Sequence, residues 1–168
     1  MDLTYRLSEV IAMVEFSLDW IMGQAGSAEF VASFPQEVIE VHTTYVGDGL
    51  GSIVKAANDL RLGSSSAIAF LPAEPGGTCL FFSGAGKEAY LQIVQFADMQ
   101  SESGRWGGGV LRWHGKVEVT QFIRGVTLMA EAVLVQCGGA AAYSKAWGGI
   151  PFPAREMSIL TGTEPDPR

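Results

Sequence analysis

The sequence predicts an α+β domain: a largely antiparallel sheet of about six or seven strands, one helix inserted after the third strand, and C-terminal helices packed on one face. Several segments alternate apolar and polar residues, which is the period of a β-strand. Residues 50–62 and 121–137 instead repeat apolar residues at helical spacing. The chain has 168 residues, of which 48% are hydrophobic, so it can bury a core without a metal or a disulfide. We expect a single globular domain over residues 1–162 and a frayed tail at 163–168.

The N-terminal third begins with predicted strands. A short alternating segment at residues 3–7 precedes a longer one at residues 10–20, and residues 37–46 form the next predicted strand. The apolar face of the long segment comprises Val10, Ala12, Val14, Phe16, Leu18 and Trp20. The pairing register of two strands cannot be read from one sequence. If these two strands pair, four polar residues share an outward surface: Glu15, Asp19, Glu40 and His42.

Residues 45–56, YVGDGLGSIVKA, lead from a predicted strand into a predicted helix. A dinucleotide-binding loop needs glycines in the pattern GxGxxG, but Ser52 stands in the place of the third glycine, and no GxxxxGK[ST] phosphate loop occurs. Asp48 fits better as the N-cap of the helix, because its carboxylate can accept a backbone N–H in the first turn. The apolar spacing then predicts a helix to about Leu62, ended by Gly63. We interpret this stretch as a helix start.

The middle of the chain is predicted to be a β-meander. Residues 66–71, 78–83 and 88–97 read as three strands joined by short glycine-containing connections. A loop begins near Asp98 and contains residues 104–109, GRWGGG. Its Arg105 and Trp106 are candidates for partner contact, although we favour a disordered connection.

The C-terminal half is predicted to add a last strand and three helices. Residues 110–119 alternate throughout, with Gly115 marking a bulge or a hairpin. Thr120 is the expected cap of a helix over residues 121–137 that Gly138 and Gly139 end. Two shorter helices are expected at residues 140–147 and 154–160.

Motifs that carry chemistry are absent from the sequence. It has no GxSxG, HExxH or CxxC, and its two histidines, His42 and His114, are far apart. We expect Cys79 and Cys137 to be buried free thiols, and we expect no cofactor and no metal. The one candidate acid/base set is Glu15, Asp19 or Glu40 with His42, but these residues lie within predicted strands, whereas catalytic groups usually lie on loops. Catalysis is therefore the alternative that we do not favour.

The net charge of −7 is concentrated in the first third of the chain. Residues 1–60 contain nine acidic and two basic residues, whereas residues 61–168 contain nine of each. This distribution argues against nucleic acid, whose binding needs clustered Lys and Arg, and favours a basic protein partner. No 18-residue apolar run and no N-terminal signal pattern occurs, so we expect a cytoplasmic protein that does not bind membranes.

Three segments carry a family resemblance: the LTYRL opening, the junction at residues 45–57 with Asp48, and the YSKAWG helix end at residues 143–148 leading into Pro151-Phe152-Pro153. Over most of its length the chain resembles small bacterial proteins, many from actinobacteria, several of which look like immunity proteins encoded near secreted toxins. In those relatives the WG segment runs into FP more directly. The resemblance implies no catalytic residues. Trp147 and Phe152 are expected to be packing residues.

These observations predict a non-catalytic, acidic binding or inhibitor protein that neutralises a basic partner, such as a toxin, in the manner of an immunity protein. Two alternatives stay open: a small hydrolase or transferase that uses a carboxylate–His pair, and a homo-oligomeric structural protein joined through an exposed sheet, for which a homodimer suffices. The interface candidates are Glu15, Asp19, Glu37, Glu40 and Asp48, with Trp20 as an apolar anchor if it is exposed.

Overall fold

The computed structural model describes residues 16–24, 26–84 and 86–164. This part of the chain contains seven strands and four helices: β1 (Ser17–Met22), β2 (Ser27–Phe34), β3 (Glu37–Thr44), α2 (Gly49–Arg61), β4 (Ser66–Ala73), β5 (Gly76–Ser83), β6 (Glu88–Phe96), β7 (Val110–Glu118), α3 (Val119–Cys137), α4 (Ala140–Ala146) and α5 (Ala154–Leu160). The predicted α+β class and the single helix between the third and fourth strands are confirmed.

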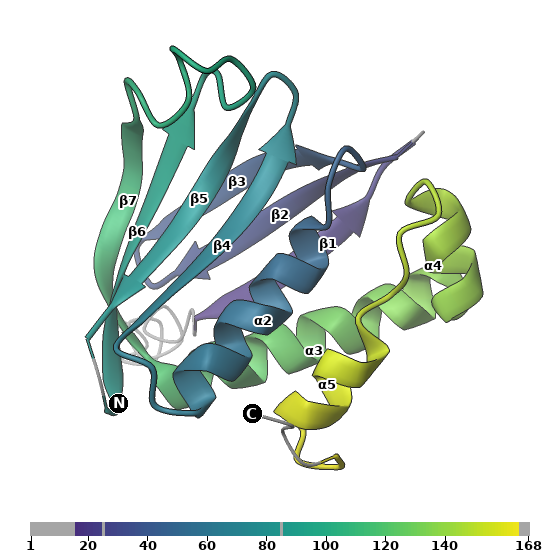
Figure 1. Ribbon diagram of the computed structural model, residues 1–168. Coiled ribbons are helices and arrows are strands. Elements are labelled where there is room, and N and C mark those ends of the chain that lie inside the picture. The colour runs from purple at the N-terminus through teal and green to yellow at the C-terminus, as the bar shows by residue number, and fades with distance from the viewer. Residues whose placement is uncertain (1–15, 25, 85, 165–168) are drawn as a thin grey trace, which may run out of the picture.

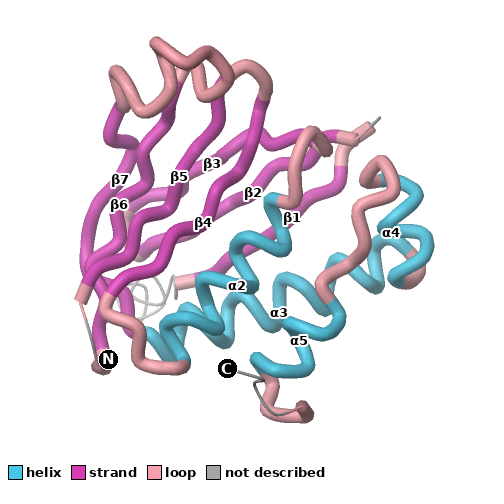
Figure 2. Tube along the Cα trace, in the orientation of Figure 1, coloured by secondary structure: helices cyan, strands magenta, loops and turns pink. Residues whose placement is uncertain are grey.

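The strands form two antiparallel sheets rather than one. One sheet has the order β1-β2-β3 and the other β4-β5-β6-β7. The sheets meet where Thr43 Oγ1 donates a hydrogen bond of 2.8 Å to the carbonyl oxygen of Pro72. Figure 1 shows the two sheets set at an angle to each other, and Figure 2 shows the helices grouped to one side of the strands.

Strand β2 was not predicted from the sequence. Its inward positions are all apolar (Ala28, Phe30, Ala32 and Phe34), and its outward positions are polar except for Val31. β1 covers the end of the predicted strand at residues 10–20, while residues 3–7 and 10–15 lie outside the described part of the chain. Because β2 lies between β1 and β3, those two strands do not pair directly.

The core is filled by the inward faces of both sheets and by α2 and α3. Phe82 of β5 contacts Phe122 of α3, with ring centroids 4.7 Å apart. The two sheets are joined by Phe34 and Trp113, whose rings stack with centroids 3.6 Å apart. Gly115 makes room for this stack, because a Cβ there would lie 2.7 Å from the Trp113 ring. Burial of such apolar side chains is the main favourable term in folding.

Helix ends follow the sequence with one exception. Asp48 caps α2 as predicted, and Gly63 and Gly138 adopt the left-handed backbone, with φ of 86° and 85°, that ends α2 and α3. α3 begins at Val119, two residues before the predicted start, and Glu118 takes the N-cap position without a side-chain hydrogen bond. Thr120 is therefore inside the helix and is not its cap.

β7 contains a bulge, but at Arg112 rather than at Gly115, which pairs regularly with Leu91. Ile93 pairs with Trp113 and Val94 with Leu111, so Arg112 is the extra residue on β7. The bulge moves Leu111 to the outer face of the sheet, where 48% of its surface is exposed. Leu111 is thus not on the buried face of β7, as uninterrupted alternation predicted.

The loop between β6 and β7 has defined internal contacts. The Asp98 carboxylate accepts hydrogen bonds from the backbone amides of Gln100 and Ser101 and from the Ser101 hydroxyl, and these hydrogen bonds lower the pKa of the carboxyl. Trp106 packs against Phe81 and Phe96, while 56% of its surface stays exposed. This loop is ordered, contrary to the favoured prediction.

The C-terminal helices close one side of the core. Trp147 is fully buried against Trp20 and donates a hydrogen bond to the Gly47 carbonyl, and Phe152 is buried against Tyr143, so both are packing residues as predicted. The backbone amide of Thr163 donates to Ser158, and residues 165–168 lie outside the described chain. Within the described ranges no single helix is long and apolar enough to cross a membrane; α3 and α4 meet that test only as a pair bent by 82°.

Candidate functional site

The structure separates the predicted interface residues into distinct places. Asp19 and Glu40 are exposed on the outward faces of β1 and β3. Glu37 begins β3 beside the β2–β3 turn, and Asp48 lies at the start of α2. Trp20 is only 5% exposed and packs against Trp147, which removes it as a surface anchor. Glu15 lies outside the described residues.

Asp19 and Glu40 do share one outward face, although β2 lies between their strands. The register places Asp19 opposite Val31 and Val31 opposite Glu40, so the three residues form one row across the sheet. Neighbouring strands are about 4.8 Å apart, which puts the two acidic residues roughly 10 Å from each other. The outward face of this sheet, which we call the acidic face, consists of Ser17, Asp19, Ile21, Ser27, Glu29, Val31, Ser33, Val38, Glu40, His42 and Thr44.

The next row of the acidic face contains a residue that the sequence analysis did not select. Glu29 lies opposite His42, and Glu29 Oε1 is 2.6 Å from His42 Nδ1. Both side chains are about half exposed, at 46% and 55%. Among the described residues, the carboxylate beside His42 is therefore Glu29 rather than Asp19 or Glu40. Recognising β2 as a strand would have placed Glu29 on this face.

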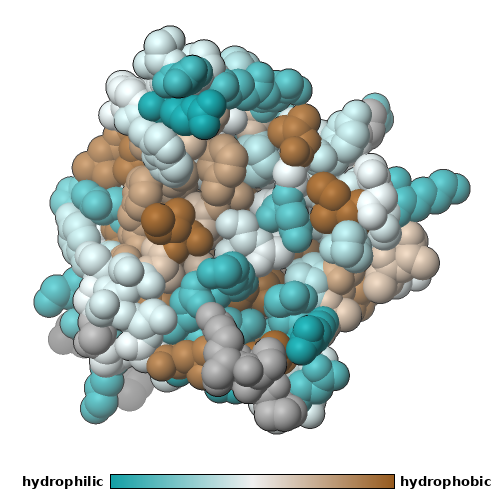
Figure 3. All heavy atoms as spheres, in the orientation of Figure 1, coloured by the Kyte–Doolittle hydropathy of each residue, from teal (hydrophilic) through white to brown (hydrophobic). Residues whose placement is uncertain are grey.

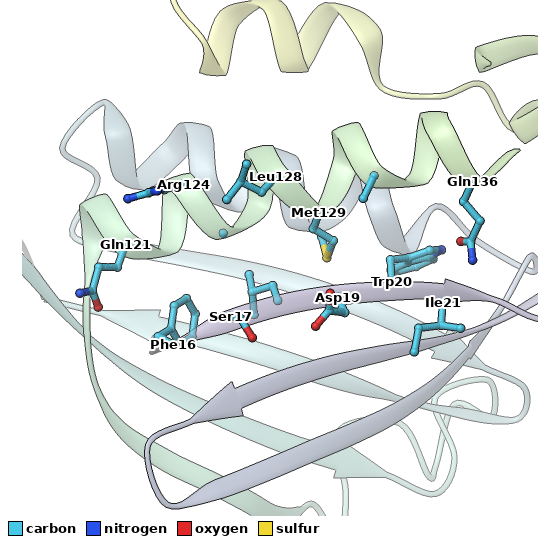
Figure 4. Close-up of a pocket in the computed structure, with 13 residues that line it drawn as sticks. Phe16, Ser17, Asp19, Trp20, Ile21, Gln121, Arg124, Leu128, Met129 and Gln136 are labelled. Carbon is cyan, nitrogen blue, oxygen red and sulfur yellow. The ribbon is translucent and has the colours of Figure 1, made fainter. Parts of the chain in front are cut away.

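A groove borders the acidic face where β1 meets α3. Its volume is about 630 Å³, and Figure 4 shows it between the helix and the strand. Ser17, Asp19 and Ile21 of β1 and Leu128 of α3 line it, and Figure 4 shows Trp20 and Met129 lying between the strand and the helix. Ile21 and Leu128 are each about half exposed, at 51% and 55%. The remaining lining residues are Phe16, Leu18, Trp20, Gln121, Arg124, Gly125, Ala132 and Gln136.

α3 runs alongside β1 in the same direction. Gly125 lies against Leu18 and Phe16, where an added Cβ would come within 3.4 Å of both side chains, and Gln136 lies beside Met22. The Gln136 side-chain oxygen accepts a hydrogen bond of 3.2 Å from the Met22 amide. Glycine at position 125 therefore sets how closely the helix approaches the strand.

The other candidate reactive groups of the sequence are the two cysteines and His114. No three His, Cys, Asp or Glu residues of this part lie close enough together to hold a metal ion. Both cysteines are free: Cys79 is buried, which raises the pKa of its thiol to about 11, and Cys137 is partly exposed. His114 is exposed and lies 2.7 Å from the Tyr90 hydroxyl. Neither histidine lines the groove at β1 or the cavity between α2 and α5 that Asp48 lines.

One part of the outer face of the second sheet is apolar, whereas the outward pairs Gln92–His114 and Tyr90–Lys116 make the rest of it polar. Ile68 pairs with Phe81, and Phe70 aligns through Cys79 with Val94 and Leu111. Figure 3 shows hydrophobic side chains gathered over β4–β7 on the face turned to the viewer. We call this set of outer positions the apolar face: Ile68, Phe70, Phe81, Val94 and Leu111.

No protein-family model, no curated protein and no solved structure matches this chain. The resemblance to immunity proteins accordingly stays a prediction.

Proposed function

We propose that this protein is a non-catalytic binding protein that captures a basic protein partner through its acidic face. The observation that carries the proposal is the register of β1, β2 and β3, which gathers Asp19, Glu29 and Glu40 on one exposed surface. Charged residues of these strands must take the solvated face, and on that face the carboxylates outnumber the one basic group, His42. The family resemblance makes a toxin or another enzyme the partner class that we favour, with this protein acting as its inhibitor in the cytoplasm, where free thiols stay reduced.

The composition of the acidic face suits capture rather than catalysis. Its carboxylates would steer a basic partner toward the surface and suppress acidic ones. Exposed apolar side chains among them, Ile21 and Val38, supply area that can be buried in a complex. The one basic group on the face, His42, is paired with Glu29.

Charge reversal tests this proposal. The tagged protein would be incubated with lysate of the cells that encode it, and bound proteins would be eluted with rising salt and identified by mass spectrometry. The test variant is Asp19→Lys with Glu40→Lys. Its matched control is Glu102→Lys with Glu164→Lys, which makes the same change in net charge at two exposed residues far from the acidic face in sequence.

The expected result is a basic protein that the wild type and the control retain, that salt releases, and that the Asp19/Glu40 variant loses at least about tenfold. Equal retention by both variants would refute the acidic face as the binding surface. Failure of the wild type to retain any basic protein would refute the proposed function itself.

The enzyme alternative has less support. The Glu29–His42 pair resembles an acid/base set, because a carboxylate can orient an imidazole. Both side chains, however, are about half exposed on a sheet face, whereas substrate sites are usually concave and exclude water. We therefore keep binding as the proposed function.

Self-association is the second candidate function, and the apolar face favours it. Ile68 and Leu111 are each about half exposed, at 53% and 48%, and offer a basic partner no charge to recognise. The strand that contributes Leu111, β7, is the outer edge of its sheet in the described chain and carries both basic and acidic residues, Arg112, Lys116 and Glu118. A second copy of the chain is the occupant that fits this surface.

A further inference from the structure

We propose that the groove between β1 and α3 binds its partner by strand addition: an extended segment, with apolar and basic residues in alternation, pairs with the free edge of β1. This inference rests on the proposed function and specifies how the partner is held. Three observations carry it: the unpaired edge of β1, the helix beside it, and the different chemistry on the two sides of that edge.

Among the residues that the structure describes, β1 has one paired edge and one free edge. In the described chain it pairs with β2 alone and is the first strand of its sheet. The Met22 amide points away from β2, because it donates to Gln136 of α3. Backbone groups of alternate residues in a strand point to the same side, so those of Leu18 and Trp20 also point into the groove. Gln136 thus occupies one of three equivalent positions along this edge.

The groove has the form that strand addition requires. An edge strand beside a helix can accept a peptide whose main chain continues the sheet, while pockets take its alternate side chains. Six residues of β1 offer roughly 20 Å of edge, enough for a segment of about six residues. The exposed Leu128 and the neighbouring Met129 and Ala132 of α3 line the other wall.

The two sides of the edge differ in chemistry, and this difference defines the segment. Side chains of an added strand that face outward would lie beside Asp19 and next to the acidic face, where basic residues are stabilised. Side chains that face the helix would meet Leu128, Met129 and Ala132, where apolar residues bury surface. Arg124 is the basic residue of this wall, and it lies at the opposite end of the groove from Gln136.

A short peptide serves as the probe. It is capped at both ends, has seven residues, and alternates valine with lysine. Binding to the full-length protein would be measured by calorimetry, and amide hydrogen exchange would be followed residue by residue. We expect binding to protect the amides of Leu18 and Trp20, because these two would enter a new ladder. The amides of Asp19 and Ile21 already face β2 and should change little.

Matched probes and variants separate the contribution of backbone hydrogen bonds to peptide binding from the contribution of side-chain charge. A peptide with N-methyl groups on the paired amides keeps every charge but loses the hydrogen bonds, and a peptide with glutamate in place of lysine keeps the hydrogen bonds. Ala132→Trp fills the groove from an exposed position, and Val135→Trp adds the same ring to α3 at an exposed residue outside the groove. We expect both altered peptides and Ala132→Trp to weaken binding at least about tenfold, with Val135→Trp unchanged.

The outcomes separate this inference from the proposed function. Strand addition would be overturned if the N-methylated peptide bound as tightly as the unmodified one, or if Ala132→Trp bound the peptide as tightly as the wild type. The acidic face would still stand as the binding surface if Asp19→Lys with Glu40→Lys abolished capture of the partner from lysate. Protection of the Leu18 and Trp20 amides in the free protein would also overturn strand addition, because the edge would then already be occupied. Equal melting temperatures of the two tryptophan variants show that a loss of binding is not a loss of fold.

Discussion

Asp48 shows how one residue can meet a structural need at an electrostatic cost. Its carboxylate accepts a hydrogen bond of 2.9 Å from the Gly51 amide and so caps α2. Partial burial nevertheless raises the pKa of this carboxyl, the Gly51 hydrogen bond opposes that rise, and the Glu156 carboxylate adds to it. The cap requires an acceptor oxygen, whereas the negative charge itself is disfavoured where it lies.

Substitutions of Asp48 should therefore separate the acceptor from the charge. Asp48→Asn keeps an acceptor and should leave the free energy of unfolding nearly unchanged, whereas Asp48→Ala should lower it by about 1 kcal/mol. Because the folded-state pKa lies above the unfolded value of 3.8, the folded state holds the proton more tightly. The stability of the wild type relative to Asp48→Asn should then fall as the pH rises through the window above 3.8. Urea unfolding at several pH values measures both effects; an equal loss in both variants would show that the charge is needed.

For single residues, the sequence predicted some structural roles correctly and others wrongly. The cap at Asp48 and the packing roles of Trp147 and Phe152 were predicted, because local spacing and aromatic size determine them. Trp20 was selected as an anchor on its type alone, although alternation placed it on the same face as Leu18, which is buried. Side-chain periodicity is the better guide to exposure than residue type.

At the scale of elements, one missed strand changed the interpretation of a whole face. β2 alternates apolar inward residues with outward residues that are polar except for Val31, a period of two that was not recognised in the sequence. Because β2 was not predicted, Glu29 could not be assigned to a sheet face. Asp19 and Glu40 were expected on neighbouring strands. Strands β4–β6 were predicted because short glycine-containing connections separate them, which sequence patterns reveal.

The stack of Phe34 on Trp113 is the contact between elements that we expect to couple the two sheets. Phe34→Ala and Trp113→Ala should each destabilise the fold, and the double mutant should be more stable than the sum of the single effects predicts, by about 0.5–1.5 kcal/mol. Chemical denaturation of the four proteins of the cycle measures this coupling. The control is the cycle of Phe34→Ala with Phe81→Ala, because Phe81 lies on the outer face of β5. In this cycle the two changes in the free energy of unfolding should add. A cycle for Phe34 and Trp113 that also adds would mean that the sheets are held together by other contacts.

At the scale of the whole molecule, the outer faces of the two sheets differ in character. The sheet β1–β3 presents three acidic residues, and the sheet β4–β7 presents the apolar face next to the polar pairs Gln92–His114 and Tyr90–Lys116. The excess of acidic residues before residue 60 predicted the first of these faces, because β1, β2 and β3 all lie in that part of the chain. The apolar face was not predicted, since the bulge at Arg112 turns Leu111 outward and no sequence pattern marks that bulge.

The two faces should respond to salt in opposite ways, and this distinguishes the two candidate functions. If the apolar face joins copies of the chain, sedimentation should show a mass that rises with concentration and does not fall with salt, because burial of apolar surface is not screened. Ile68→Lys with Leu111→Lys should keep the protein monomeric without loss of thermal stability, since both side chains are about half exposed. Ile21→Lys makes the same kind of change on the other sheet and should leave the mass unchanged. A wild type that stays monomeric at all concentrations would remove self-association as a function, whereas a dimer that Ile21→Lys dissolves would place the contact at β1 and compete with the partner proposed for that edge.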